Sequence, residues 1–164
     1  MHLKDLVLNH KAGFTEKVER LFAKKYEISI EQVREEHKAA IEQYIQGKYK
    51  GIDRVVSKIL EFKLPVVLSI RRDPCSEYVC MICERDKPNI EELRQLYSDR
   101  IGFIDVFDST PEGALYHIIQ QHGECENLLP LIAIIYNGEV IKYWSCRPVG
   151  VEEYRKYLDP LLQS

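Results

Sequence analysis

The chain has 164 residues, 45% of them hydrophobic and 30% charged, with a formal net charge of −3 at pH 7. This length suffices for one hydrophobic core and a helical extension, and the slightly acidic balance does not favour a nucleic-acid-binding protein. No stretch approaches the roughly 18 consecutive apolar residues of a membrane helix, and residues 1–10 lack the pattern of a secretory signal. We therefore expect a cytoplasmic protein with no membrane or nucleic-acid partner.

The N-terminal part of the chain contains no strand pattern and is predicted to be helical, because apolar residues recur at helical spacing. Ser29 and Gln32 have the spacing of a capping box at the start of a second helix. Gly47 and Gly51 are expected to interrupt that helix, and a third amphipathic run follows. Residues 1–51 are thus predicted to form a helical arm that packs on its own chain or, as the alternative, on a second copy in a homodimer.

The pattern changes after Pro65. Residues 66–70 form a short, apolar and β-branched run, typical of a strand that is buried on both faces. A helix is predicted from about 80 to 98, with a kink or restart at Pro88, because proline lacks the amide donor. The next strand is predicted at 101–107.

The C-terminal part continues the alternation of helices and strands. Thr110 and Pro111 are typical of a helix start, and this helix is expected to extend to Gly123. The Asn137-Gly138 pair predicts a hairpin, because both residues of such a turn adopt positive φ. The other predicted elements are strands at 131–136 and 140–144 and a helix at 151–162. The order of elements predicts an α/β fold with parallel pairing among the first strands and one antiparallel hairpin.

The chain contains five cysteines, an odd number that does not suit a secreted disulfide framework. Cys80 and Cys83 form a CxxC motif at the predicted start of a helix. A helix N-terminus supplies free amides and a partial positive charge, which lower the pKa of a cysteine and favour the reactive thiolate. This pattern therefore indicates redox chemistry.

The chain from about residue 52 resembles the thioredoxin family. The resemblance rests on the CxxC motif with Pro88 five residues after its second cysteine, on the Leu129-Pro130 pair, and on the Asn137-Gly138 turn eight residues further on. It implies a three-layer α/β/α domain over 52–164 with a mixed four-stranded sheet, preceded by the arm. It also implies that Cys80 is the nucleophile and Cys83 the resolving thiol, and that a cis amide at Leu129 and Pro130 binds the substrate.

The sequence departs from the family pattern in two places. The connection from 71 to 79 is about five residues longer than in the family and carries Cys75, which we predict as a third thiol of the site. Ser69 stands where the family often has a buried acid that relays protons, and Asp105 in the next strand is the predicted substitute.

Two alternatives remain open from the sequence. Cys75, Cys80 and Cys83 have the C-x4-C-x2-C spacing of three ligands of a plant-type iron-sulfur cluster. With Cys146, or with Cys125 from the loop before Pro130, they would also suit zinc. The second alternative is a thioredoxin-like module without catalysis. The preferred interpretation is a thiol-disulfide oxidoreductase without a cofactor, which acts on protein or small-molecule disulfides and has a reductase as a further partner.

Overall fold

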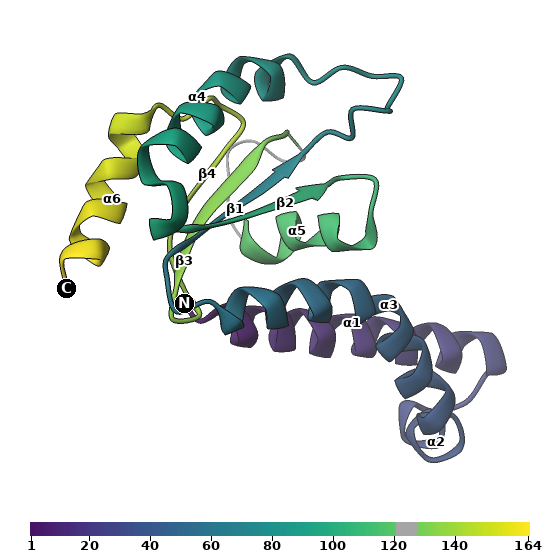
Figure 1. The fold of residues 1–164 in the computed structure, drawn as a ribbon. Coiled ribbons are helices and arrows are strands. Elements are labelled where there is room, and N and C mark those ends of the chain that lie inside the picture. The colour runs from purple at the N-terminus through teal and green to yellow at the C-terminus, as the bar shows by residue number, and fades with distance from the viewer. Residues whose placement is uncertain (121–127) are drawn as a thin grey trace.

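A four-stranded mixed sheet forms the centre of the molecule (Figure 1). The computed structural model describes residues 1–120 and 128–164. Strand β1 pairs in parallel with β2, and β3 forms an antiparallel hairpin with β4, as the order of elements predicted. Strand β1 also pairs with β3, and this pairing is antiparallel, which the order of elements did not indicate. The strands are β1 (Val66–Arg71), β2 (Gly102–Phe107), β3 (Leu131–Tyr136) and β4 (Glu139–Ser145), in the spatial order β2-β1-β3-β4.

Helices cover both faces of the sheet. Helices α4 (Met81–Tyr97) and α6 (Val151–Gln163) pack on one face, around Leu93, Trp144 and Tyr154. The other face is covered by α5 (Leu115–Ile119), by the start of α1 (Leu3–Tyr26) and by the end of α3 (Lys38–Glu61). Short 3₁₀ helices, Ser98–Arg100 and Pro111–Ala114, precede β2 and α5. The result is the three-layer, thioredoxin-like α/β/α fold with an N-terminal helical extension.

The side chains of strand β1 alternate between the two cores on either face of the sheet. Val66, Leu68 and Ile70 of β1 face the core formed with α1, α3 and α5, whereas Val67 faces α4 and α6. Successive side chains of a strand point to opposite faces, so Ser69 and Arg71 share the α4 side with Val67. This alternation explains why β1 reads as a continuous apolar run, since both of its faces are buried.

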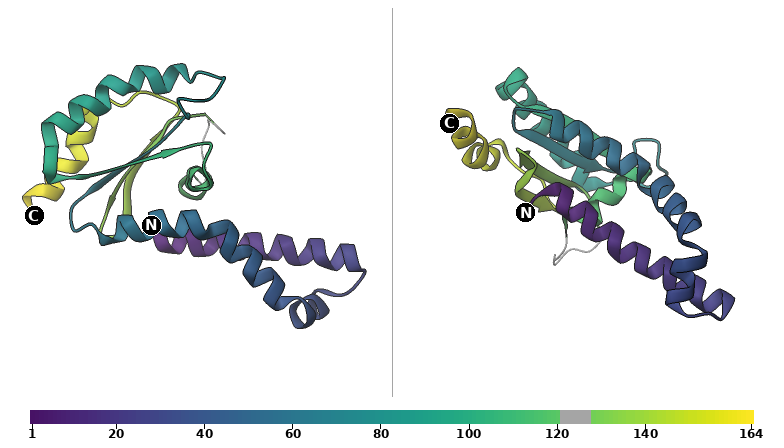
Figure 2. Two further views of the ribbon diagram at one scale, coloured as in Figure 1. Left: turned by 45° about the vertical axis from the view of Figure 1, so that its right-hand side comes forward. Right: turned by 90° about the horizontal axis from the view of Figure 1, so that it is seen from below.

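The helical arm consists of α1, α2 (Ile30–Glu36) and α3, and its far end around α2 projects away from the sheet (Figure 2). The capping box of Ser29 and Gln32 is present. Val18, Val33 and Ile41 form a small core between the three helices, so the arm packs partly on itself, as preferred from the sequence. The second helix predicted from the sequence was expected to be interrupted at Gly47 and Gly51. This prediction is wrong, because α3 continues through both glycines.

The beginning of the chain is joined to the β-hairpin, which the sequence did not indicate. The Leu3 amide donates to the Gly138 carbonyl at 2.7 Å, and the Val140 amide donates to the Met1 carbonyl at 3.1 Å. Leu3, Leu6 and Val7 of α1 lie in the same core as Ile52 and Val56 of α3. The predicted division after residue 51 falls inside α3, and residues from both sides of it share this core.

We expect Gly138→Ala to destabilise the protein by about 1–2 kcal/mol, because an L-residue is strained at positive φ. Gly138 has φ +80°, and an added Cβ would lie 2.2 Å from Nε2 of His2, the residue that caps α1. Gly47→Ala is the matched control, since nothing lies within 4 Å of its added Cβ. The control should stabilise α3 by about 0.5–1 kcal/mol. Urea unfolding measures both, and equal effects of the two changes would contradict the prediction.

Two further differences from the predicted elements concern the helix after Thr110 and the position of Pro88. The helix predicted from Thr110 to Gly123 is a 3₁₀ turn followed by α5, and its predicted end lies outside the described residues. Pro88 lies inside α4, which does not restart there but bends along its length (Figure 1).

In the described parts of the chain, no helix is both long enough and apolar enough to cross a membrane.

Candidate active site

Cys80 and Cys83 are joined in a disulfide at the N-terminus of α4, with their Cα atoms 5.3 Å apart. Cys80 has an extended backbone, with φ −90° and ψ 101°, and is the N-cap of the helix. Its Sγ accepts the Cys83 amide hydrogen at an N···S distance of 3.2 Å. A sulfur atom at this position faces free amides of the first helical turn, the environment that stabilises a thiolate.

The Leu129-Pro130 peptide bond is cis, as the resemblance implied. Cys80 Sγ lies 3.8 Å from the Leu129 carbonyl oxygen, so this loop is the direct neighbour of the outer cysteine. Tyr116 of α5 holds the preceding residue, because its hydroxyl donates to the Leu128 carbonyl at 2.9 Å. No pattern in the sequence distinguished Tyr116 from an ordinary helix residue.

Cys146 supports the same loop. Its amide donates to the Pro130 carbonyl at 3.1 Å, and its Sγ lies 3.6 Å from the Leu128 carbonyl oxygen. Cys146 has φ +64°, a left-handed conformation that lets the chain turn immediately after β4. Cys146, predicted to lie near the dithiol, thus contacts the segment 128–130, which Cys80 also contacts.

A buried ion pair lies behind Cys83, and the sequence analysis missed it. Asp86 of α4 is fully buried, and one of its oxygens contacts the Arg71 guanidinium at the end of β1. The same guanidinium donates to the Cys83 carbonyl at 3.3 Å. The Val149 amide donates to the other Asp86 oxygen at 2.7 Å. Asp86 therefore ties α4 to β1 and to the segment before α6, directly below the disulfide.

Tyr154 lies beside this ion pair, and the charge of Asp86 affects the pKa of its phenol. Its ring is fully buried, and its hydroxyl has no hydrogen-bond partner among the described residues. Burial, followed by the negative charge of Asp86, raises the pKa of Tyr154 above its ordinary value of 10. The phenol is therefore neutral at pH 7.

Asp105, the predicted proton relay, pairs in the structure with a side chain of α4 that does not belong to the dithiol. It is the neighbour of Ser69 across β1 and β2, as expected, but it lies on an edge strand and is exposed. Its carboxylate pairs with Arg94, eleven residues beyond Cys83 along α4. At 1.5 Å per residue this separation is about 16 Å. Among residues 1–120 and 128–164, the buried acid next to the disulfide is Asp86.

Cys75 lies in the long connection before α4 as an exposed free thiol. Asp73 fixes this connection, because it accepts hydrogen bonds from the Cys75 amide at 2.8 Å and from the Ser109 hydroxyl at 2.5 Å. These hydrogen bonds, that of Ser109 above all, lower the pKa of Asp73. A hollow of about 60 Å³ is lined by Cys80 and Cys83 but not by Cys75. The predicted third thiol is thus accessible without being part of the dithiol hollow.

No group of three or more His, Cys, Asp or Glu side chains within residues 1–120 and 128–164 is arranged to hold a metal ion. The candidate set of Cys75, Cys80, Cys83 and Cys146 is therefore not brought together as a metal site. Cys125, the other thiol considered for it, lies outside the described residues.

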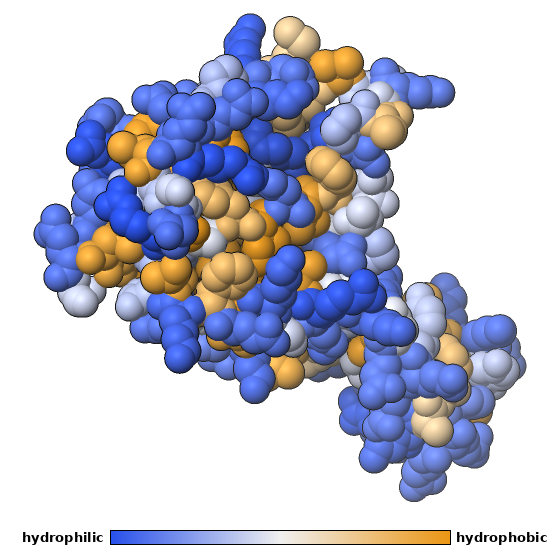
Figure 3. Space-filling model, viewed as in Figure 1, coloured by the Kyte–Doolittle hydropathy of each residue, from blue (hydrophilic) through white to orange (hydrophobic). Residues whose placement is uncertain are grey.

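Exposed apolar side chains surround the outer cysteine. Tyr78, Val79 and Met81 flank Cys80 in the chain and are 61–74% exposed, and Leu128 next to the cis peptide is 51% exposed. Hydrophobic residues accordingly interrupt the hydrophilic surface over the connection before α4, whereas the far end of the arm is mainly hydrophilic (Figure 3). Apolar side chains that remain exposed at a reactive group are typical of a contact surface for another molecule.

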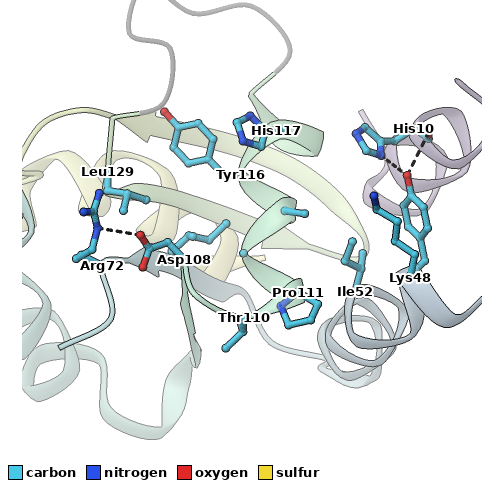
Figure 4. A pocket seen from close by; sticks show the side chains of 14 residues that line it. His10, Lys48, Ile52, Arg72, Asp108, Thr110, Pro111, Tyr116, His117 and Leu129 are labelled. Carbon is cyan, nitrogen blue, oxygen red and sulfur yellow. Dashed lines mark hydrogen bonds and ion pairs between the residues drawn. The ribbon is translucent and has the colours of Figure 1, made fainter. Parts of the chain in front are cut away.

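A cavity of about 460 Å³ lies between the arm and the sheet (Figure 4). Arg72, Asp108 and Leu129 line one end, beside the dithiol, and His10 and Lys48 line the other end. Arg72 pairs with Asp108 at 2.8 Å and also lines the small hollow around Cys80. The cavity therefore adjoins the disulfide.

His10 of α1 forms a hydrogen bond of 2.6 Å between its Nδ1 and the Tyr49 hydroxyl of α3. Partial burial lowers the pKa of His10 below its ordinary value of 6.5, and the positive charges of His117, Lys17 and Lys48 lower it further. Burial, with a contribution from Asp53, raises the pKa of Tyr49, so both partners are neutral at pH 7.

This lowered pKa predicts a pH dependence of stability. Between the folded pKa of His10 and the unfolded value of about 6.5, the unfolded chain binds more protons than the folded chain, so stability falls as the pH decreases through this range. Urea unfolding at pH 7.5 and 5.5 should show a larger loss for the wild type than for His10→Gln. Equal losses in the two proteins would exclude this contribution.

The fold and this site together define a thioredoxin-like α/β protein whose CxxC pair forms a disulfide beside a cis-proline loop. No protein-family model matches the chain, and no curated protein matches it either.

Proposed function

We propose that the protein is a thiol-disulfide oxidoreductase related to the thioredoxin family. The observation that carries the proposal is the Cys80–Cys83 disulfide at the N-terminus of α4, with Cys80 Sγ next to the Leu129 carbonyl of the cis peptide. A disulfide at a helix N-terminus is readily reversible, because the departing thiolate is stabilised by the free amides and the helix dipole.

The reaction proceeds by two exchanges. The Cys80 thiolate attacks one sulfur of a substrate disulfide, so that a mixed disulfide forms and the other substrate sulfur leaves as a thiolate that takes up a proton. The Cys83 thiol then loses its proton and attacks the Cys80 sulfur. This step releases the second substrate thiol and forms the Cys80–Cys83 bond, so that the substrate gains two electrons and the protein loses two.

The surroundings support this division of roles. Cys80 is partly accessible, whereas Cys83 is 6% exposed and lies toward the core, as an attacking and a resolving cysteine should. The exposed Tyr78, Val79 and Leu128 supply an apolar contact surface for the substrate, and the cis peptide supplies main-chain hydrogen-bonding groups. The thiols need no cofactor for this chemistry, and a cytoplasmic reductase or a small dithiol restores the reduced state.

An insulin-reduction assay with dithiothreitol tests the proposal. Wild-type protein is expected to accelerate precipitation of the insulin B chain at least tenfold over dithiothreitol alone, and Cys80→Ser is expected to abolish the acceleration. Cys75→Ser is the matched control, because Cys75 is a free thiol of the same connection that does not line the dithiol hollow. The proposal is wrong if the wild type does not accelerate the reaction, or if Cys80→Ser retains the wild-type rate.

A further inference from the structure

The cavity between the arm and the sheet has a buried apolar floor. Ile52 of α3, Ile70 of β1 and Leu129 of the cis-proline loop line it, and each is at most 7% exposed. The buried rings of Tyr49 and Tyr116 complete this floor. A volume of about 460 Å³ and an apolar floor are typical of a cavity that receives another molecule or one of its side chains.

The charged groups at the two ends of the cavity have opposite charges beside them. At the end near the dithiol, Arg72 pairs with Asp108 at 2.8 Å. At the arm end, the Glu112 carboxyl lies beside Gly51, about one turn from Lys48 along α3. These opposite charges offset one another, so the cavity does not select a charged ligand.

Aromatic groups form the side of the cavity next to α1 and α5. His10 and Tyr49 are hydrogen-bonded at 2.6 Å, and both are neutral at pH 7, because burial lowers the pKa of His10 and raises that of Tyr49. The rings of Tyr116 and His117 lie edge to face, with their centroids 5.2 Å apart. Aromatic rings pack well against a further ring in edge-to-face or offset geometry. The cavity therefore favours an uncharged, aromatic occupant.

The cavity meets the dithiol at the cis-proline loop. The side chain of Leu129 lines the cavity, and its carbonyl oxygen lies 3.8 Å from Cys80 Sγ (Figure 4). Tyr116 also belongs to both places, because its ring lines the cavity and its hydroxyl donates to the Leu128 carbonyl. Arg72 lines the cavity and the small hollow around Cys80. A chain that runs along this loop with its sulfur at Cys80 therefore reaches the cavity with a neighbouring side chain, from the dithiol end.

We propose that this cavity is a specificity pocket, which receives an aromatic side chain of a polypeptide substrate close in sequence to the cysteine that reacts with Cys80. This inference rests on the proposed function and specifies its substrate class. The exchange at the sulfur atoms is unchanged: Cys80 and Cys83 are oxidised to their disulfide, and the substrate disulfide takes up two electrons and two protons and leaves as two thiols. Because α1 and α3 form one wall of the cavity, the helical arm takes part in substrate selection.

Peptide disulfides that differ in one side chain test the proposal. Seven-residue peptides with blocked ends carry a central cysteine and serine elsewhere, with phenylalanine in turn at each of the other six positions. Each peptide is used as its disulfide-linked dimer, and 2-hydroxyethyl disulfide, which has no side chains, is the reference substrate. The reduced protein is mixed with each disulfide, and the loss of free Cys80 and Cys83 is followed by acid quenching, alkylation and mass spectrometry.

We expect phenylalanine at one or two of these positions to raise the second-order rate constant about tenfold over the peptide without phenylalanine, because its ring becomes buried in an apolar cavity. Ala114→Phe fills the cavity from the 3₁₀ helix and should reduce this preference to about twofold or less. Ala39→Phe is the matched control and should keep the full preference, since Ala39 is an exposed residue of α3 that does not line the cavity. The rate with the reference substrate should be the same in all three proteins and reports whether Ala114→Phe is folded.

N-Acetylphenylalanine amide, an uncharged aromatic molecule without sulfur, gives a second measurement on the unmodified protein. It should slow the reaction with the preferred peptide and leave the reaction with the peptide that lacks phenylalanine unchanged. The inference is overturned if all peptides react at the same rate, or if the amide does not compete. It is also overturned if folded Ala114→Phe keeps the preference, which would then belong to the exposed apolar side chains around Cys80. Reaction with 2-hydroxyethyl disulfide reports on the proposed function alone, so its failure is distinguishable from failure of this inference.

Discussion

Replacement of Asp86 by Ala is expected to lower the free energy of unfolding by about 3–5 kcal/mol, because it leaves the Arg71 charge without its buried partner. The change also removes the acceptor of the Val149 amide, which lies in a buried hydrogen bond. A loss of this size is a large fraction of the total stability of a typical domain. Urea unfolding of the oxidised protein measures it.

Two further variants make this prediction specific. Asp105→Ala removes an exposed carboxylate that pairs with Arg94 on the same side of the sheet, and it should cost no more than about 1 kcal/mol. The double change Arg71→Met with Asp86→Leu removes both charges and should be more stable than Asp86→Ala alone. If Asp86→Ala and Asp105→Ala cost the same, the buried pair does not have the structural importance that its position indicates.

Cys83→Ser is expected to convert the protein from a catalyst into a trap. Cys80 still attacks a disulfide substrate, but without the Cys83 thiol nothing resolves the mixed disulfide from within the protein. After incubation with oxidised insulin and gel filtration without reductant, most Cys83→Ser molecules should carry one insulin adduct at Cys80. The wild type should carry few, because its own resolving thiol removes them.

The control for this experiment is the double variant Cys80→Ser with Cys83→Ser, which retains the exposed Cys75 as well as Cys146. It should form little adduct, since Cys75 lies outside the dithiol hollow at the start of α4 and its own amide binds Asp73. An equal amount of adduct in the double variant would assign the reactive thiol to Cys75 or to another cysteine. That result would overturn the assignment of Cys80 as the nucleophile.

The sheet could be predicted because its signals are local. The apolar run at 66–70 and the Asn137-Gly138 pair each predict a backbone conformation from residues that are adjacent in the chain. The two turn residues do have φ of +50° and +80°. The continuity of α3 could not be predicted from its glycines. Gly47 has open space around it, and a buried stripe that includes Tyr49, Ile52 and Val56 offsets the low helix propensity.

The candidate site likewise has one part that the sequence predicted and one part that it did not. The spacing of Cys80, Cys83 and Pro130 pointed to a dithiol beside a cis-proline, and these groups do lie together. The predicted acid, however, was Asp105, because it lies in the strand that follows Ser69 in the chain. Asp86 looks like a surface residue between charged neighbours in a helix, and only the packing of α4 against β1 and the segment before α6 buries it.

The sequence by itself determined the strands, the hairpin turn and the disulfide-forming pair of this protein, because apolar runs, turn residues and a CxxC spacing depend on residues close together in the chain. Tertiary structure alone decided which acid lies beneath Cys83, which tyrosine holds Leu128, and that the arm encloses a cavity beside the dithiol. These features join residues as far apart as His10 and His117, whose proximity arises from the burial of apolar faces of α1, α3 and α5 on one side of the sheet.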